Sequence, residues 1–168
     1  MIILEQEIII DIYFYKKELI LSPFFSNKYM ISNELMEFLC KEIQSDYLSK
    51  KIILNFNNND ISSGERSIYK KAIHYTYEKL FEEINLKIKR MNIISFLMFM
   101  IWFIILGLAV VVKSIKLNTI FIEVFQIIAW VFVWDSVDIF VFKRNRLKEL
   151  RNKYAVLNNV NVVFNFLY

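Results

Sequence analysis

The chain has 168 residues, of which 57% are apolar and 17% aromatic, and it carries a formal net charge of +4. This composition is too apolar for a disordered chain, and a single cysteine with a single histidine excludes an intrachain disulfide and a His/Cys zinc site. Two glycines cannot supply a phosphate-binding loop or a dinucleotide-binding fingerprint. After these exclusions a small membrane protein remains, and we expect it to hold no metal and no cofactor.

The N-terminal third of the chain predicts short strands and one helix. Side chains alternate between two faces over residues 8–15, which is the period of a β-strand. Residues 18–21 are expected to form a second short strand, which ends at Ser22 and Pro23. Residues 33–44 carry apolar side chains on one helical face behind a capping residue, Ser32 or Asn33.

The next segment predicts a strand, a turn and the start of a long helix. Residues 51–56 read as a strand, and an asparagine-rich turn follows over residues 57–60. Ser62 and Glu65 have the spacing of a capping box, in which each side chain satisfies a free backbone amide at a helix start. No glycine or proline interrupts residues 66–106, so we expect one helix to rise from there into the first apolar run.

Two apolar runs predict a transmembrane hairpin. Residues 93–112 carry no charge and would span about 30 Å as a helix, the thickness of the hydrocarbon layer. Residues 119–142 are also long enough to cross, and residues 113–118 are too short for anything except a tight connection. The alternative, a buried helical pair of a soluble protein, is disfavoured by the 20 unbroken residues of the first run.

The Lys and Arg residues predict the orientation of this hairpin. Thirteen of them precede the first span, two lie within the hairpin and six follow the second span. The positive-inside rule then places both termini in the cytoplasm. The basic flanks on either side of the hairpin would contact the bilayer at its anionic headgroups.

The second span is expected to continue as a helix through residues 143–154, and residues 160–166 alternate as a C-terminal strand. The expected fold is therefore an α+β cytoplasmic domain plus a two-helix transmembrane hairpin on long continuous helices. The N-terminal and C-terminal strands would form one small sheet. We expect a cytoplasmic part over residues 1–90, the hairpin over 91–143, and a cytoplasmic helix with the closing strand over 144–168.

The second span carries a polar stripe, the main candidate for function. Its five residues fall within roughly 120° of one helical face: Glu123, Gln126, Trp130, Trp134 and Asp138. Asp135 stands at its edge. Ionisable groups inside a bilayer are costly and face a bundle interior or a water-filled cavity. Because two helices cannot shield such a stripe, we infer a homo-oligomer in which the second span faces the axis or a neighbouring subunit.

Two interpretations of the polar stripe stay open. In the first, Glu123 and Asp138 form acidic rings at the mouths of a cation pore, and the two tryptophans form an apolar constriction. In the second, the carboxylates lie near the interfaces, where Asp135 and Asp138 pair with Lys143 or Arg144, and the tryptophans pack or anchor at the headgroups.

Residues outside the spans offer weaker candidates. Two lysine pairs, Lys50–Lys51 and Lys70–Lys71, could bind an anion such as a nucleotide, although a solvated surface is the simpler interpretation because residues 1–91 hold 13 basic and 13 acidic side chains. His74 lies beside an apolar seam of the long helix, and Cys40 is expected to be an inert buried thiol. No nucleophile–base pair appears at useful spacing, so we do not expect an enzyme.

The sequence from Ala129 to Asp138, Ala-Trp-Val-Phe-Val-Trp-Asp-Ser-Val-Asp, is followed by a basic stretch and a terminal strand. This pattern resembles a widespread group of small bacterial two-span membrane proteins. By this resemblance Trp130, Trp134, Asp135 and Asp138 are the positions that matter. The layout also resembles membrane effectors of antiphage defence, such as the Hailong-type channel subunit.

That second resemblance implies a cytoplasmic domain that senses a nucleotide or oligonucleotide signal made by a partner enzyme, and oligomeric spans that depolarise the membrane. It transfers no ligand-binding residue to this chain. The expected function is therefore a homo-oligomeric bacterial membrane effector, an ion channel or pore gated by its cytoplasmic domain. The alternative is a non-conducting membrane anchor or scaffold whose cytoplasmic domain docks a partner protein.

Overall fold

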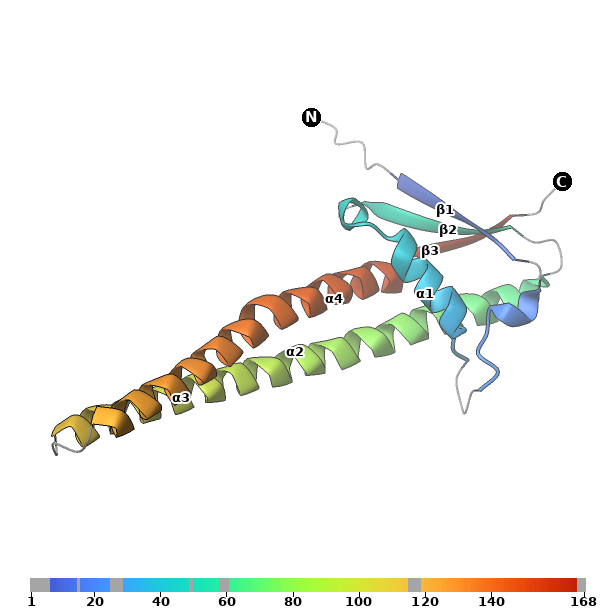
Figure 1. Ribbon diagram of the computed structural model, residues 1–168. Helices are drawn as coiled ribbons and strands as arrows, with labels where there is room; N and C mark the ends of the chain where they lie inside the picture. The colour runs from blue at the N-terminus through green and yellow to red at the C-terminus, as the bar shows by residue number, and fades with distance from the viewer. Residues whose placement is uncertain are drawn as a thin grey trace. The chain divides into compact units, whose positions relative to one another are not determined.

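A computed structural model of the chain is mostly helical and contains one small parallel sheet (Figure 1). It describes residues 7–14, 16–24, 29–48, 50–57, 61–114 and 119–165. The chain divides into two compact units. The sheet unit combines Met1–Glu83 with Glu149–Tyr168, and the two-helix unit is Ile84–Lys148.

The sheet unit is built on three parallel strands in the order β1-β2-β3. They are β1 (Glu7–Tyr13), β2 (Lys51–Asn57) and β3 (Asn161–Asn165). The register sets Ile10 beside Leu54, and Leu54 beside Val162, in one buried row. The predicted strands over residues 8–15, 51–56 and 160–166 are thus confirmed within one or two residues at each described end, and the C-terminal strand joins the N-terminal ones as expected.

One face of this sheet forms the core of the unit. Helices lie on the same side of the strands in Figure 1, and their apolar side chains are buried completely, as at Leu39, Ile73 and Leu157. The other face carries exposed side chains, including Ile9 and Tyr13 at 60% and 66% exposure. Alternation along β1 therefore separates a buried face from an exposed one, as a half-covered strand requires.

The predicted strand over residues 18–21 is wrong. Residues Lys17–Leu19 form a short 3₁₀ helix, η1, and Leu21 makes only an isolated antiparallel bridge with Ile31. This apolar segment is too short to continue a ladder, and Ser22 and Pro23 follow it. Its backbone instead binds the residues just before Asn33: the Ser32 N–H donates a hydrogen bond to the Ile20 carbonyl at 2.9 Å.

Both predicted helix starts are confirmed. Helix α1 covers Asn33–Glu42, and the Ser32 hydroxyl caps it by accepting from the Leu35 N–H at 3.2 Å. Helix α2 begins with the predicted capping box: the Ser62 N–H donates to Glu65 Oε2 at 2.9 Å, and the Glu65 N–H donates to Ser62 Oγ at 3.4 Å. Most of the predicted turn, residues 58–60, lies outside the described residues, and Asn57 belongs to β2.

Helix α2 runs without interruption from Ser63 to Ser114, which confirms the long continuous helix. The apolar seam predicted along it is buried at Ile73, Tyr77, Ile84 and Ile88. Residues 65–106 of this helix contain no glycine or proline to weaken the backbone hydrogen bonds, and the helix also continues through Gly107. The connection over residues 115–118 lies outside the described residues.

The second apolar run also forms a continuous helical segment, with a change of geometry inside it. Helix α3 covers Thr119–Val137, a π-helical segment η3 covers Asp138–Lys143, and helix α4 covers Arg144–Asn158. In η3 the hydrogen bonds widen to the i→i+5 pattern, as in the bond from the Arg144 N–H to the Ile139 carbonyl. The continuation through residues 143–154 is confirmed, and the π-helical segment was not predicted.

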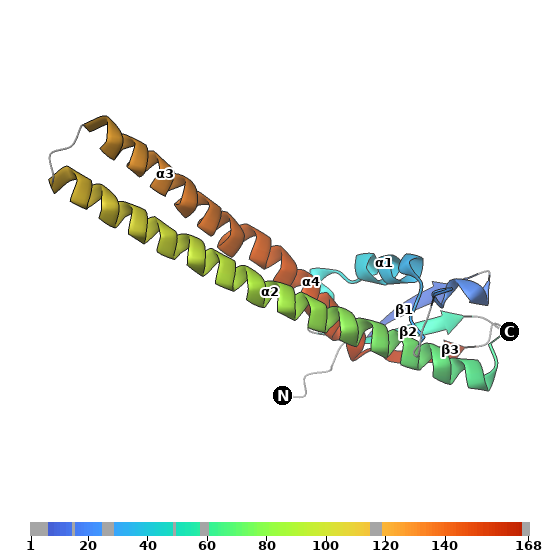
Figure 2. The same ribbon diagram turned by 90° about the horizontal axis from the view of Figure 1, so that it is seen from below.

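Within the two-helix unit, α3 lies beside the second half of α2 (Figures 1 and 2). The Ser95 hydroxyl donates to the Ser136 carbonyl and the Ser136 hydroxyl to the Ser95 carbonyl, both at 3.1 Å. Ala109 and Ala129 are buried as well. Small side chains and exchanged hydroxyl bonds of this kind allow close approach of two helices in an apolar medium.

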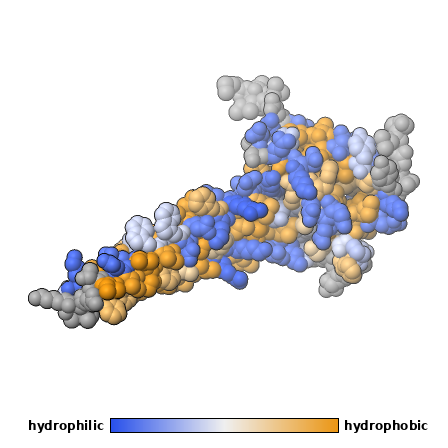
Figure 3. Space-filling model, in the orientation of Figure 1, coloured by the Kyte–Doolittle hydropathy of each residue, from blue (hydrophilic) through white to orange (hydrophobic). Residues whose placement is uncertain are grey.

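Two helices of the structure are long and apolar enough to cross a membrane. They are Ser63–Ser114 and the segment Ile120–Asn158, and only 11% of the most apolar window of each is buried within the structure. Figure 3 shows hydrophobic side chains gathered along the part of the surface formed by α2 and α3. These apolar surfaces are thus left for a lipid or protein environment to cover.

Candidate functional site

The polar stripe on α3 is largely exposed. Trp130 and Trp134 keep 60% and 66% of their surface accessible. Glu123 and Gln126 are exposed too, and Asp138 is half-buried at the start of η3. The polar stripe therefore lies on one helix, and the rest of the described chain buries little of its surface.

The packing of α3 explains this exposure. Ala129 and Ser136 are its two buried side chains among the described residues, and Ser136 bonds to α2. At 100° per residue, the centre of the stripe lies roughly 130° around the helix from these two positions. The stripe is thus turned away from the face that α3 packs against α2, so the neighbouring helix of the same chain does not shield it.

The charges at the end of the stripe are only partly neutralised. Lys143 Nζ lies 2.7 Å from an Asp138 carboxylate oxygen, an ion pair that joins the two ends of η3. Asp135 is exposed and has no salt-bridge partner within 4.0 Å among the described residues. The second sequence interpretation thus has one of its expected pairs, while Asp135 keeps an uncompensated charge in the part of the chain described.

The two lysine pairs are not brought together. Lys50 and Lys51 line one hollow of about 340 Å³ beside α4, and Lys70 and Lys71 line another of about 670 Å³ beside α2. The Lys51 ammonium already contacts the Glu7 carboxylate at 2.5 Å.

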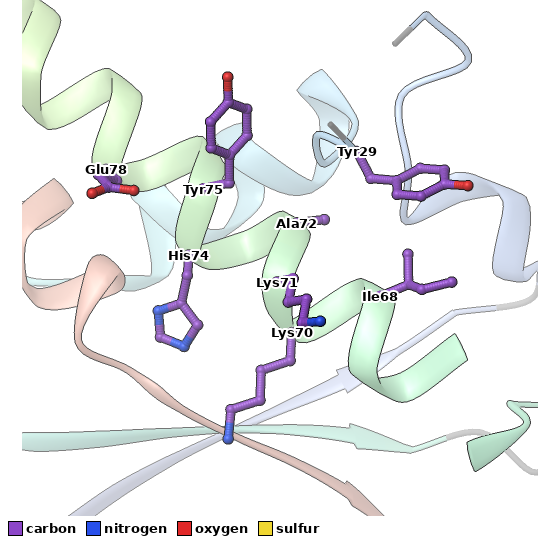
Figure 4. A pocket seen from close by; sticks show the side chains of 8 residues that line it. All are labelled: Tyr29, Ile68, Lys70, Lys71, Ala72, His74, Tyr75 and Glu78. Atoms are coloured by element: carbon purple, nitrogen blue, oxygen red, sulfur yellow. The ribbon is translucent and has the colours of Figure 1, made fainter. Parts of the chain in front are cut away.

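Figure 4 shows that the residues around the larger hollow do not converge on a common centre. The His74 side chain points toward the strands, whereas the Tyr75 side chain points to the opposite side of the helix. This arrangement matches a solvated helix surface better than a shaped anion site, which concentrates several donors on one point.

The surroundings of His74 and Cys40 indicate roles in packing and not in chemistry. His74 Nδ1 lies 2.5 Å from the Asn158 carbonyl oxygen at the end of α4, so the ring joins α2 to α4. Burial raises the pKa of the Cys40 thiol, although the nearby Lys153 ammonium acts in the opposite direction. A thiol of raised pKa is a poor nucleophile near neutral pH. Across the described residues, no group of three His, Cys, Asp or Glu side chains could hold a metal ion.

The sequence analysis missed a second feature of the two-helix unit, the buried pair Ser95 and Ser136. Its signal was available, because Ser95 is the single clearly polar residue of the first apolar run. A polar residue in such a run needs a partner within hydrogen-bonding distance. The partner on α3 could not be chosen from the sequence, because it depends on the register between the two helices.

Comparisons of the chain with models of protein families, with curated proteins and with solved structures found no significant match. The family resemblance of residues 129–138 therefore stays a prediction.

Proposed function

We propose that the chain is a homo-oligomeric protein of the bacterial inner membrane, with α2 and α3 crossing as an antiparallel hairpin and both termini in the cytoplasm. Two observations support the membrane part: the length and hydropathy of the two helices, and the excess of Lys and Arg on the flanks of the hairpin. The extensive exposure of apolar side chains on both helices agrees with a lipid environment.

The exposed polar stripe is the observation that carries the oligomer. A carboxylate near the middle of a transmembrane helix costs about 2.5–3.5 kcal/mol on insertion scales, and Asp135 has no neutralising partner among the described residues. Copies of the same chain, packed stripe to stripe around an axis, would remove Asp135 and the two exposed indoles from lipid. A water-filled axis would hydrate the carboxylates at the same time.

A channel is the function that this arrangement supports best. Rings of Glu123 and Asp138 would favour cations, and a collar of Trp130 and Trp134 between them would form an apolar constriction that gates by dewetting. Helix α2 is continuous from Ser63 to Ser114, so a change in the sheet unit could be transmitted along a stiff element. We propose an effector channel of this kind, gated by its cytoplasmic domain and, by its resemblance, employed in antiphage defence.

Ion flux through liposomes that contain the purified protein tests the channel. We expect a cation flux that Trp134→Ala and Asp138→Asn change at least fivefold in rate or selectivity. Ile128→Ala is the matched control, because Ile128 is also exposed on α3 but lies outside the polar stripe. Absence of any flux from oligomeric protein, with or without candidate nucleotides, would overturn the channel. A monodisperse monomer in a bilayer mimic would overturn the oligomer as well.

A non-conducting anchor is the second candidate, and the ion pair between Asp138 and Lys143 favours it. That pair neutralises the stripe at its cytoplasmic end without any pore, as a headgroup-level anchor requires. In this case the cytoplasmic sheet unit would dock a partner protein. A stable heteromeric complex recovered from membranes, together with the absence of flux, would favour the anchor over the channel.

A further inference from the structure

An apolar groove lies between α2 and α3 within the two-helix unit. Its volume is about 460 Å³, and its lining is almost entirely apolar. Asn92, Phe96 and Phe99 line it from α2. The facing residues Val137, Phe140 and Val141 come from the end of α3 and from η3.

The floor of the groove offers no free polar group. The Ser95 and Ser136 side chains that line it are buried and exchange hydrogen bonds with each other's backbone carbonyls. A cavity holds ordered water only where it offers the water several polar partners. Because these hydroxyls are already bonded, the groove is suited to a hydrocarbon chain and not to a column of water.

An arginine stands beside this groove with an unused donor. The Arg144 guanidinium carbon lies 4.6 Å from the centre of the Phe140 ring, and that ring lines the groove. Arg144 Nε is buried and has no hydrogen-bond partner among the described residues. A buried donor without a partner destabilises a folded chain, so a ligand oxygen that reached Arg144 would stabilise the structure.

We propose that the groove binds one acyl chain of an anionic phospholipid, whose phosphate accepts a hydrogen bond from Arg144. Guanidinium groups bind phosphate oxygens through paired N–H donors, and basic pockets between transmembrane helices on the cytoplasmic side are sites for anionic headgroups.

The charge around the groove selects this occupant over a second copy of the chain. Lys87, Lys89 and Arg90 are exposed in the same unit, two to five residues before Asn92 in the chain. A second copy seated in the groove would bring the same basic residues to this end and would add like charge. An anionic headgroup neutralises these side chains instead. Two carboxylates adjoin the groove-lining residues Ser136 and Val137 in the chain: Asp138 is paired with Lys143, and Asp135 is exposed.

The inference rests on the proposed crossing of the membrane by α2 and α3, and its test uses the full-length protein in mild detergent. Native mass spectrometry would count the lipids retained after titration with dioleoylphosphatidylglycerol or with dioleoylphosphatidylcholine. We expect the first to bind at least fivefold more tightly. Arg144→Gln should remove this preference, whereas the matched control Arg146→Gln should change the affinity less than twofold.

A second variant keeps the test independent of the arginine. Val141→Trp should fill the groove and weaken binding of both lipids at least fivefold while Arg144 remains, with helix content and monodispersity checking that each variant folds. Equal affinity for the two lipids, or equal loss in the two arginine variants, would overturn the proposal. So would full competition by glycerol 3-phosphate, or a disulfide between copies carrying Phe96→Cys in a Cys40→Ser background. If instead the protein is found in the soluble fraction of cells, the proposed membrane crossing fails first.

Discussion

Tyr77 and Cys40 are neighbouring polar side chains of the largely apolar core of the sheet unit. The Tyr77 side chain is completely buried, and its hydroxyl has no hydrogen bond of standard geometry; the Cys40 thiol, a weak partner, is its neighbour. Burial raises the pKa of Tyr77 far above its ordinary value of 10.0, and burial also raises the pKa of Cys40 above 9.0. Both groups are therefore held neutral by the fold.

These raised pKa values predict a loss of stability in alkali. In the unfolded chain the two groups ionise at their ordinary values, while in the folded chain they stay protonated, so the unfolded state binds fewer protons above about pH 9 and folding weakens as pH rises. Below that pH neither group changes the stability. Tyr77 should contribute up to about 1.4 kcal/mol of destabilisation per pH unit above pH 10, and the partly exposed Cys40 less.

The measurement is urea unfolding of the full-length protein in detergent between pH 8 and 11. Tyr77→Phe should flatten the decline in unfolding free energy over this range and leave stability at pH 8 within about 1 kcal/mol, since the hydroxyl makes no strong bond. Tyr13→Phe is the control, because Tyr13 is 66% exposed and should leave the decline unchanged. A decline that is the same in wild type and Tyr77→Phe would contradict the expectation.

The burial of Tyr77 could be predicted from the sequence, but its neighbour could not. Apolar residues recur every three or four positions along α2, which identifies its buried face. Cys40 lies on α1, and nothing in the local pattern of either helix specifies which residues of the two meet. The same reason explains why the contact of His74 with Asn158, 84 positions later, had no signal in the sequence.

Among the elements, those specified by local chemistry were predictable. The capping box at Ser62 and Glu65 and the N-cap at Ser32 depend on side chains within three residues of the amides they bind. The expected strand over residues 18–21 failed because strand formation depends on a distant partner, which that segment has only at Leu21. The π-helical segment η3 contains no glycine or proline to mark it.

The geometry of η3 has a measurable consequence for the ion pair at its ends. Asp138 and Lys143 are five residues apart, which would place them about 140° apart on a regular α-helix. The i→i+5 turns of η3 bring them to 2.7 Å instead. A π-helical segment corresponds to one residue more than the α-helix holds, so it keeps α3 and α4 in a fixed rotational relation despite the added residue.

Deletion of one residue within η3 should therefore be tolerated. Removal of Phe142, which is 67% exposed, would convert the segment to an α-helix in which Asp138 and the following lysine are four residues apart and can still pair. Removal of Val131 from the regular α3 should turn Glu123, Gln126 and Trp130 about 100° relative to Ser136 and so divide the polar stripe. We expect the first deletion to lower the melting temperature in detergent by only a few degrees and the second to disrupt assembly.

Thermal unfolding and size-exclusion chromatography of the two deletion variants check this prediction. If the Phe142 deletion and the Val131 deletion prove equally disruptive, η3 is not an accommodated insertion. If both leave the oligomer intact, the rotational position of the polar stripe does not determine assembly, and the proposed packing of α3 loses its support.

For the whole molecule, the sequence predicts the fold class better than the site. Hydrophobic patterns alone indicate two long apolar helices and strands at both ends of the chain, and these are present. The pattern also identifies the polar stripe, because carboxylates and tryptophans stand out in an apolar run. The cover of Trp130, Trp134 and Asp135 could not be predicted, because the local pattern of one helix does not specify the register in which it packs against another.

The orientation of the chain in the membrane is a prediction that one labelling experiment can test. In a Cys40→Ser background, Lys113→Cys places a thiol at the exposed end of α2, and Asn161→Cys places one on the exposed face of β3. Because Lys and Arg are concentrated on the flanks outside the hairpin, the positive-inside rule predicts that position 113 faces the periplasm and position 161 the cytoplasm.

A membrane-impermeant maleimide should then label Lys113→Cys in spheroplasts at least tenfold faster than Asn161→Cys, and permeabilisation should make the two rates similar. Rapid labelling of Asn161→Cys before permeabilisation would invert the topology and move the sheet unit, together with any signal it binds, to the outside of the cell.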